Sequence, residues 1–243
     1  ATNEVRGLAV GDSHYTYFLD LDGVPLDDLM IYRLAQDHFL IVVNASNNDK
    51  NWAWLNAVKN GEVQIDAAHP SRRFTGGSTF ELRDLRSPVN GADCRLDIAL
   101  QGPNSKNILL TMTDDAGKTA INKLQWANIA RVKLKGMDII ISRTGYTGER
   151  IAYELFVHPN DALELFRDLI DAGAAPAGLA ARDSLRTEAG LPLYGHELGV
   201  ILDGAYTLNP ADAGFGNYAK LWKSFFVGKA AFITHEAERD AEI

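Results

Sequence analysis

The sequence predicts an α+β protein in which helices cover antiparallel sheets. Two observations indicate this class. Short runs rich in β-branched and aromatic residues follow one another with brief polar breaks that contain turn residues, which is typical of hairpins. Longer segments with apolar residues at helical spacing come after those runs. The chain has 243 residues, of which 46% are hydrophobic, so it can form one large domain or two small ones with cores of their own.

The first half of the chain begins as an antiparallel meander. Asp22-Gly23 and Gln36-Asp37 are natural turn sites between strand-like runs. The predicted strands are residues 15–21, 28–34 and 38–44.

A helix should follow the meander and cover it. Ser46 is the predicted N-cap of this helix, and Gly61 supplies its stop. Trp52, Leu55 and Val58 fall on one side of the helix. We therefore expect that side to pack on the sheet.

Residues 69–93 are rich in proline, glycine, serine and charge, and they read as an elaborated loop rather than a domain linker. Strands and helices resume after this loop, and their alternation resembles that of the first half. Two related α+β subdomains are therefore predicted. The predicted strands of the second half are residues 95–100, two short strands within 131–143 on either side of Gly136, and 153–158; the predicted helices are 103–112, 159–173 with its stop at Gly173, and a stretch within 178–198.

Composition excludes several classes of function. The net charge is −8, so nucleic acid is not expected as a partner. Cys94 is the only cysteine, and the six histidines lack the spacing of metal ligands, so neither a disulfide framework nor a metal site is expected. No apolar run has membrane-spanning length. We expect a cytoplasmic protein that does not enter membranes.

Two adjacent carboxylates, Asp27 and Asp28, lie in the segment GVPLDDLMIY, where an apolar strand should begin. Because neighbouring residues of a strand face opposite sides, one of the two should point inward. One interpretation is a turn pair that caps backbone amides. The other is a buried carboxylate beside a cavity, and the residues alone leave both open.

A second unusual segment is RTGYTGERIAYELFV, residues 143–157. Glycines on either side of Tyr146 and Thr147 allow close approach of the backbone. Glu154 interrupts an otherwise apolar strand, and by itself it reads as an exposed residue paired with a cation across the sheet. The segment is neither a phosphate loop nor a dinucleotide fingerprint, because the required lysine and third glycine are absent.

A third segment, residues 178–198, has an arginine at a position where the helical pattern predicts an apolar residue. On a helix, Arg182 shares a stripe with Leu179 and Leu185, which predicts that it lies on the buried face. A buried arginine needs an anion or several acceptors, because an unpaired buried charge is very costly. An ion pair with a neighbouring turn is the alternative to a bound anion.

Taken together, these segments resemble the aminomethyltransferase family, which comprises the T-protein of the glycine cleavage system and its folate-dependent relatives. The resemblance covers nearly the whole chain. The combination of ARDSLRTEAGLPLYG with RTGYTGE is its most specific part. The matching segments, in the family's order, are GVPLDDLMIYRL, FLIVVNASNNDKNWAWL, IALQGPNSKNIL, SRTGYTGERIAYELFV and AGLAARDSLRTEAGLPLYGHEL.

The resemblance implies that two related subdomains bind tetrahydrofolate around a central pocket. A T-protein takes the aminomethyl group from the lipoyl arm of the H-protein, releases ammonia and forms 5,10-methylenetetrahydrofolate, without a metal. Asp28 matches the essential carboxylate of the family. Asn44, Tyr146, Glu154 and Arg182 match positions around the folate, and the glutamate is the residue that hydrogen-bonds the pterin.

The chain also departs from the family pattern. It has one residue more than the family between the matched tyrosine and glutamate, and Asp212 and Asn217 replace a glutamate and a tryptophan. Both flanks of the family's chain look absent, among them the C-terminal barrel domain. The expected organisation is the remainder of the first subdomain at residues 1–94, the second subdomain at 95–200, and a linker toward the missing domain at 201–243.

Three alternatives to aminomethyl transfer stay open. The first is a folate-dependent demethylase that acts on another amine or on a sulfonium donor. The second is a folate-binding relative without catalysis, from a branch whose motif KGCYxGQE differs from RTGYTGE at the lysine and the cysteine. The third is a truncated fragment that only folds.

Overall fold

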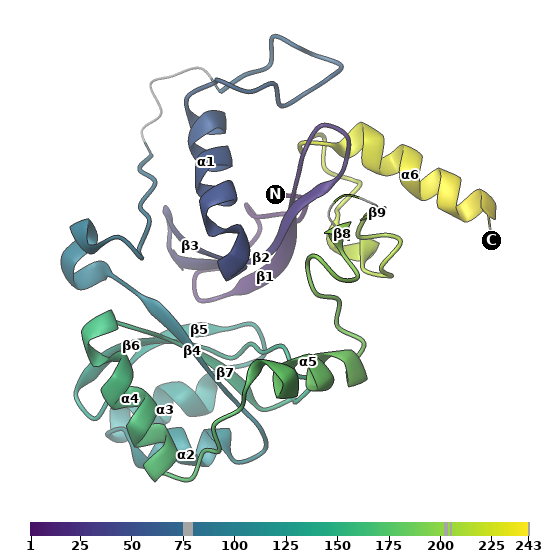
Figure 1. The fold of residues 1–243 in the computed structure, drawn as a ribbon. Helices are drawn as coiled ribbons and strands as arrows, with labels where there is room; N and C mark the ends of the chain where they lie inside the picture. Colours follow the sequence, from purple (N-terminus) through teal and green to yellow (C-terminus); the bar gives the residue numbers. More distant parts are fainter. Residues whose placement is uncertain (75–79, 202–203, 205, 243) are drawn as a thin grey trace. The chain divides into compact units, whose positions relative to one another are not determined.

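The computed structural model describes residues 1–74, 80–201, 204 and 206–242. The chain divides into two compact units (Figure 1). The first unit contains residues 1–82 and 192–243, and the second contains residues 83–191. The subdomain boundaries expected from the sequence stay a prediction.

The first unit is built on the predicted antiparallel meander, which the structure confirms. The strands lie in the order β1-β2-β3, and both pairs are antiparallel. Strand β2 begins earlier than predicted, so both Asp27 and Asp28 lie inside it. The bounds are β1 Ser13–Leu19, β2 Pro25–Ala35 and β3 His38–Val43.

Helix α1 follows the meander, but its start differs from the prediction. A short 3-10 turn, Ala45–Asn47, comes first, and α1 runs over Asn48–Lys59. The predicted N-cap at Ser46 is therefore wrong, because Ser46 lies inside the extra turn and Asn47 occupies the cap. The predicted stop at Gly61 is confirmed by its φ of 68°, a left-handed conformation that favours glycine.

Helix α1 packs on the sheet through fewer apolar residues than expected. Leu55 contacts the buried cluster formed by Phe18, Leu29 and Ile31. Trp52 is only half-buried, whereas the buried residue of the helix is polar, Asn51. A polar side chain in this position requires a hydrogen-bond partner in the sheet.

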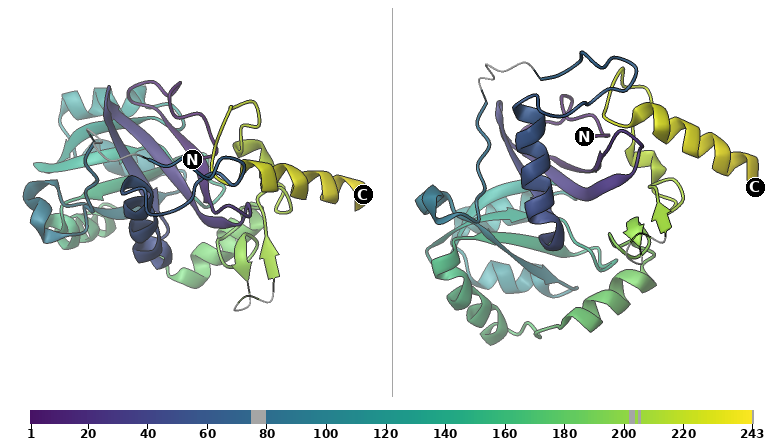
Figure 2. Two further views of the ribbon diagram at one scale, coloured as in Figure 1. Left: turned by 90° about the horizontal axis from the view of Figure 1, so that it is seen from above. Right: turned by 45° about the horizontal axis from the view of Figure 1, so that its top comes forward.

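The end of the chain completes the first unit with a small hairpin and a helix (Figure 2). Phe232 packs into a second cluster with Tyr17 and Leu19. The helix starts immediately after Gly228, where an added Cβ would lie 2.2 Å from the carbonyl oxygen of Asp20, so only glycine permits this approach. The elements are β8 Gly199–Ile201, β9 Tyr206–Leu208, a 3-10 turn at Gly216–Tyr218 and α6 Lys229–Glu242.

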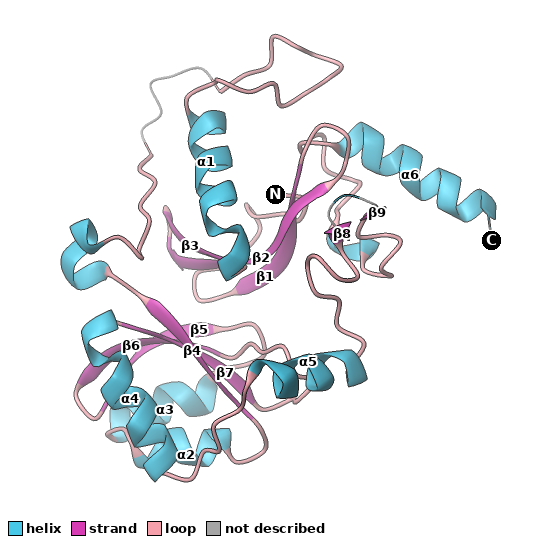
Figure 3. Cartoon of the chain, in the orientation of Figure 1, coloured by secondary structure: helices cyan, strands magenta, loops and turns pink. Residues whose placement is uncertain are grey.

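The second unit is a four-stranded antiparallel sheet with the order β4-β7-β6-β5 (Figure 3). The predicted hairpin around Gly136 is confirmed. Lys135 and Gly136 both have positive φ, as the tightest hairpin turns require. The strands are β4 Leu96–Gln101, β5 Ile129–Leu134, β6 Met137–Ser142 and β7 Ala152–Val157.

Four helices belong to the second unit, and the sequence analysis missed one of them. Helix α3 is capped by Asp114, whose side chain accepts a hydrogen bond from the backbone N–H of Gly117 at 2.8 Å. A glycine in the first turn weakens the helical signal, but the capping aspartate could have revealed the helix. The helices are α2 Ser105–Thr111, α3 Asp115–Lys123, α4 Pro159–Asp171 and α5 Leu179–Glu188.

The core of the second unit lies between one face of the sheet and its helices. Leu155 of β7 and Leu165 of α4 are both fully buried there. Helix α4 packs as predicted and ends before Gly173, which has a φ of 105°. However, Leu163, Phe166 and Ile170 of the same helix are exposed, so only part of its apolar stripe meets the core.

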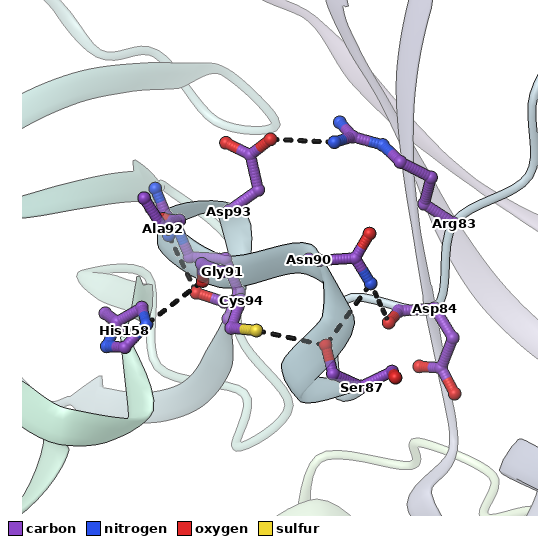
Figure 4. A network of polar contacts seen from close by, with 10 residues as sticks. Arg83, Asp84, Ser87, Asn90, Gly91, Ala92, Asp93, Cys94 and His158 are labelled. Atoms are coloured by element: carbon purple, nitrogen blue, oxygen red, sulfur yellow. Dashed lines mark hydrogen bonds and ion pairs between the residues drawn. The ribbon is translucent and has the colours of Figure 1, made fainter.

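The predicted loop leads into β4 through a turn that is held by hydrogen bonds (Figure 4). Residues 75–79 of this loop lie outside the described residues. The turn contains a 3-10 segment, Pro88–Asp93. The buried thiol of Cys94 donates to the carbonyl oxygen of Ser87 at 3.1 Å, and an Nη1–H of Arg83 donates to Asp93 at 2.7 Å. Cys94 is thus a packing residue of this turn.

None of the helices in the described ranges combines the length and the apolar character needed to cross a lipid bilayer.

Candidate functional site

The five predicted site residues fall into two groups, one in each unit. Asp28 and Asn44 belong to the first unit, and Tyr146, Glu154 and Arg182 belong to the second. Contacts join Asp28 to Asn44 in the first unit and Arg182 to Tyr146 in the second.

Asp28 is held by two hydrogen bonds. It lies on β2, on the face opposite to Leu29, and is half-buried. Its Oδ2 accepts from the phenol O–H of Tyr15 at 2.8 Å, and its Oδ1 accepts from Nδ2 of Asn44 at 2.8 Å. Each carboxylate oxygen therefore has a donor, which fixes the orientation of the carboxylate.

Asp27 points to the opposite side of β2 and is fully buried. The turn-pair interpretation of the two aspartates is wrong, because β2 begins before both of them. Asp27 accepts hydrogen bonds from the side-chain amides of three asparagines, at 2.9 Å from Asn44 and 2.6 Å from each of Asn47 and Asn51. The backbone N–H of Asn44 also donates to it, at 3.1 Å.

Asn44 was predicted as a site residue, but Tyr15, Asn47 and Asn51, which also hold these carboxylates, were not. Tyr15 is on β1, whereas Asn47 and Asn51 are one turn apart at the start of α1. Polar residues at a spacing of four lie on one face of a helix, and this face also carries Leu55, which packs on the sheet. Asparagines on the same helix face as a core leucine could therefore have predicted a polar contact between α1 and β2.

Burial raises the pKa of both carboxyl groups. For Asp28, the hydrogen bond from Tyr15 opposes the effect of burial, and the negative charge of Asp27 adds to the increase in pKa. Burial and the charge of Asp28 in turn raise the pKa of the Tyr15 phenol, which keeps it a donor. Among the described residues, no lysine or arginine forms an ion pair with either aspartate. A carboxylate pair of this kind favours a positive charge placed beside it.

In the second unit, Tyr146 is presented by a tight loop between β6 and β7. Its backbone N–H donates to Oε1 of Gln101 at 3.1 Å. A Cβ on Gly145 would lie 2.4 Å from the Cβ of Ala152, and Gly148 has a φ of 77°. The predicted close approach of the backbone is confirmed, and Gln101 is a further residue that the sequence analysis missed.

Arg182 contacts Tyr146, but it is not on a buried face. Its guanidinium carbon lies 4.7 Å from the centre of the Tyr146 ring, a cation–π distance. The prediction that Arg182 is buried is wrong, because Leu179 on the same stripe is 83% exposed and Arg182 itself is exposed.

The buried arginine of α5 is Arg186, which is 3% exposed. It donates to Asp183 through Nε at 2.7 Å and through Nη2 at 2.6 Å. The predicted ion pair with a neighbouring turn thus exists, but for Arg186 instead of Arg182. All the other residues of α5 are exposed, so the predicted buried stripe through Arg182 is not present.

Glu154 lies in the middle of β7 and is half-buried. Its cross-strand neighbours are Ala99 and Ser142, so neither residue directly opposite Glu154 is a cation. The hydroxyl of Thr144 donates to one of its carboxylate oxygens. The hydroxyls of Thr144 and Ser142 also bond to each other, at 2.5 Å.

The loop that carries Tyr146 also borders a cavity of about 440 Å³ in the second unit. Tyr146 and Glu154 do not line it. The lining residues are Trp126, Arg143, Gly145, Gly148, Glu149, Arg150 and Leu191.

Residues 1–223 match the protein family described as GCVT N-terminal domain. The chain is 36% identical over 241 residues to an aminomethyltransferase of Halothermothrix orenii, with 98% of this chain and 58% of that protein covered. It is 37% identical over 246 residues to an aminomethyltransferase of Bacillus subtilis, with 99% of this chain and 59% of that protein covered.

The fold is similar to a solved structure of the glycine cleavage system aminomethyltransferase T from Bartonella henselae. The TM-score is 0.71 at 28% sequence identity, and the match covers 98% of this chain and 56% of that chain. The chain therefore spans a little more than half the length of these relatives.

Proposed function

Since the chain belongs to the GCVT N-terminal domain family, we propose that it provides the tetrahydrofolate site of an aminomethyltransferase of the glycine cleavage type. In the proposed reaction, an aminomethyl group carried on the lipoyl arm of an H-protein is transferred to tetrahydrofolate. The products are ammonia, 5,10-methylenetetrahydrofolate and the H-protein, whose lipoyl arm is released in the dithiol (dihydrolipoyl) form. Tetrahydrofolate supplies the two nitrogen atoms that accept the one-carbon unit. The proposed location is the cytoplasm.

The single observation that carries this proposal is the carboxylate of Asp28. It is oriented by Tyr15 and Asn44, and among the described residues no cation is paired with it. Transfer of an aminomethyl carbon develops positive charge at that carbon once the amine leaves. A fixed anion beside the carbon stabilises this charge without reorganising in the transition state.

The predicted site residues of the second unit have side chains that can bind the pterin ring of tetrahydrofolate. Glu154 can accept two N–H donors from an aminopyrimidine edge in parallel, and Thr144 orients one of its oxygens. Arg182, over the ring of Tyr146, offers a charge to an anionic part of the ligand. These roles agree with the chemistry of each side chain.

Tetrahydrofolate binding measured by calorimetry tests the proposal. The wild-type chain should bind, and both Asp28→Asn and Arg182→Ala should bind more weakly. If the wild-type chain does not bind tetrahydrofolate at all, the proposed site is wrong. If it binds but releases no ammonia from aminomethylated H-protein, a demethylase acting on another amine or sulfonium donor, or a folate-binding protein without catalysis, becomes the better description.

Replacing Glu154 with alanine is expected to weaken tetrahydrofolate binding by about 1 to 3 kcal/mol, the usual effect of leaving buried donors unpaired. Calorimetric titration of the variant measures this loss directly. Glu149→Ala is a matched control from the same region, since the carboxylate of Glu149 accepts from the nearby backbone N–H of Ile151. Equal affinities of wild type and Glu154→Ala would contradict the role of Glu154.

A further inference from the structure

We propose that Asp27 is a positioning residue, which acts through the side-chain amide of Asn44 to hold the Asp28 carboxylate in its working orientation. Asn44, Asn47 and Asn51 surround Asp27, and we call these three residues the asparagine cradle. The inference rests on the proposed function only for the chemical role of Asp28. The contacts that support it lie entirely within the first unit.

Asp27 accepts four hydrogen bonds, two on each carboxylate oxygen. Its Oδ1 accepts from Nδ2 of Asn44 and of Asn47, and its Oδ2 accepts from Nδ2 of Asn51 and the backbone N–H of Asn44. All four donors are neutral. Two donors on each oxygen lock the carboxylate against rotation, whereas its charge is not cancelled by any of them.

The side-chain amide of Asn44 forms hydrogen bonds to both aspartates. Its Nδ2 lies 2.9 Å from Oδ1 of Asp27 and 2.8 Å from Oδ1 of Asp28. The backbone carbonyl oxygen of Asp28 lies 3.1 Å from the same nitrogen. A primary amide has two N–H groups, so one can bond Asp27 while the other bonds Asp28. A change in the orientation of Asp27 must therefore change the donor that orients Asp28.

Burying the Asp27 carboxylate within the asparagine cradle costs free energy of folding. A buried carboxylate without a cation loses hydration that neutral donors replace only in part, and apolar groups of similar volume are often equally stable in such places. Oδ1 of Asn51 is also buried without a hydrogen-bond partner among the described residues. A buried carboxylate held only by neutral donors is weak evidence for a stabilising role, and control of Asp28 explains why it is there.

A double-mutant cycle on the rate of ammonia release from aminomethylated H-protein tests the inference. Asp27→Asn keeps the side-chain shape and should lower kcat roughly tenfold, the usual effect of weakening a hydrogen bond to a charged group, and it should raise the KM for tetrahydrofolate by less than Asp28→Asn does. In the Asp28→Asn background the same change should have almost no further effect. Equal fold-losses in both backgrounds would show that Asp27 acts independently of Asp28 and would overturn the inference.

A second measurement does not depend on the proposed function. With aspartate labelled by ¹³C at the carboxyl carbon, the Asp28 signal is identified by its loss in Asp28→Asn. This signal should move in Asp27→Asn and in Asn51→Ala. Asn56→Ala is the matched control, because Asn56 is on the same helix and its amide donates to the backbone carbonyl oxygen of Trp52 instead of to Asp27. An Asp28 signal that is identical in wild type, Asp27→Asn and Asn51→Ala would overturn the inference even in a chain without transferase activity.

Discussion

Replacing Asp28 with asparagine is expected to lower the rate of ammonia release from aminomethylated H-protein by about 100-fold or more, the usual effect of removing a preorganised electrostatic group. The variant keeps the size of the side chain but removes the anion that would stabilise positive charge on the transferred carbon. Tyr15 and Asn44 hold the wild-type carboxylate in a single orientation. The measurement is single-turnover ammonia release at saturating tetrahydrofolate.

The matched control is Asp37→Asn, the same change at an exposed turn of the same sheet, and it should leave the rate unchanged. A rate of Asp28→Asn within about twofold of wild type, against the loss expected for such a group, would contradict the assigned role. The pH dependence offers a further check. Burial, together with the charge of Asp27, raises the pKa of Asp28, and only the anion is active in the proposed mechanism. Wild-type activity should therefore fall on the acid side at a higher pH than an ordinary aspartate would allow.

Replacing Leu155 with alanine is expected to lower the free energy of unfolding by about 3 kcal/mol or more, the range observed when a large buried side chain leaves a cavity. Leu155 is fully buried in the core of the second unit, between the sheet and helices α2, α3 and α4. Close packing on all sides prevents the neighbours from filling the space. Urea unfolding followed by circular dichroism gives the change in the midpoint.

Leu163→Ala is the matched control for this prediction. Leu163 lies on α4, is 60% exposed, and should change the free energy of unfolding by less than about 0.5 kcal/mol, as is usual for surface substitutions. Similar losses for both variants would mean that the exposed stripe of α4 is covered in solution. The comparison thus tests the packing of α4 as well as the core itself.

The order and type of most elements could be predicted from the sequence, because they depend on local patterns. Turn residues at Asp22-Gly23 and Gln36-Asp37 separated the strands of the meander. Gly136 located the second hairpin, and in the structure it has the positive φ that the turn requires. Helix α3 was missed because Gly117 in its first turn weakens the local helical pattern. A residue can be selected for packing although it has a low helix propensity. Gly117 is such a residue, because a Cβ at this position would collide with Thr113.

Residue type and spacing along the chain were enough to predict the meander, the hairpin around Gly136 and the family to which the chain belongs. Which aspartate is fully buried, and which arginine of α5 is buried, became clear only from the packing of the folded chain. Spacing along a helix defines a stripe, but the direction of that stripe depends on the partners that pack against it. Likewise, Asp27 meets Asn51 across 24 residues of sequence, and a contact of that kind exists only after β2 and α1 have packed together.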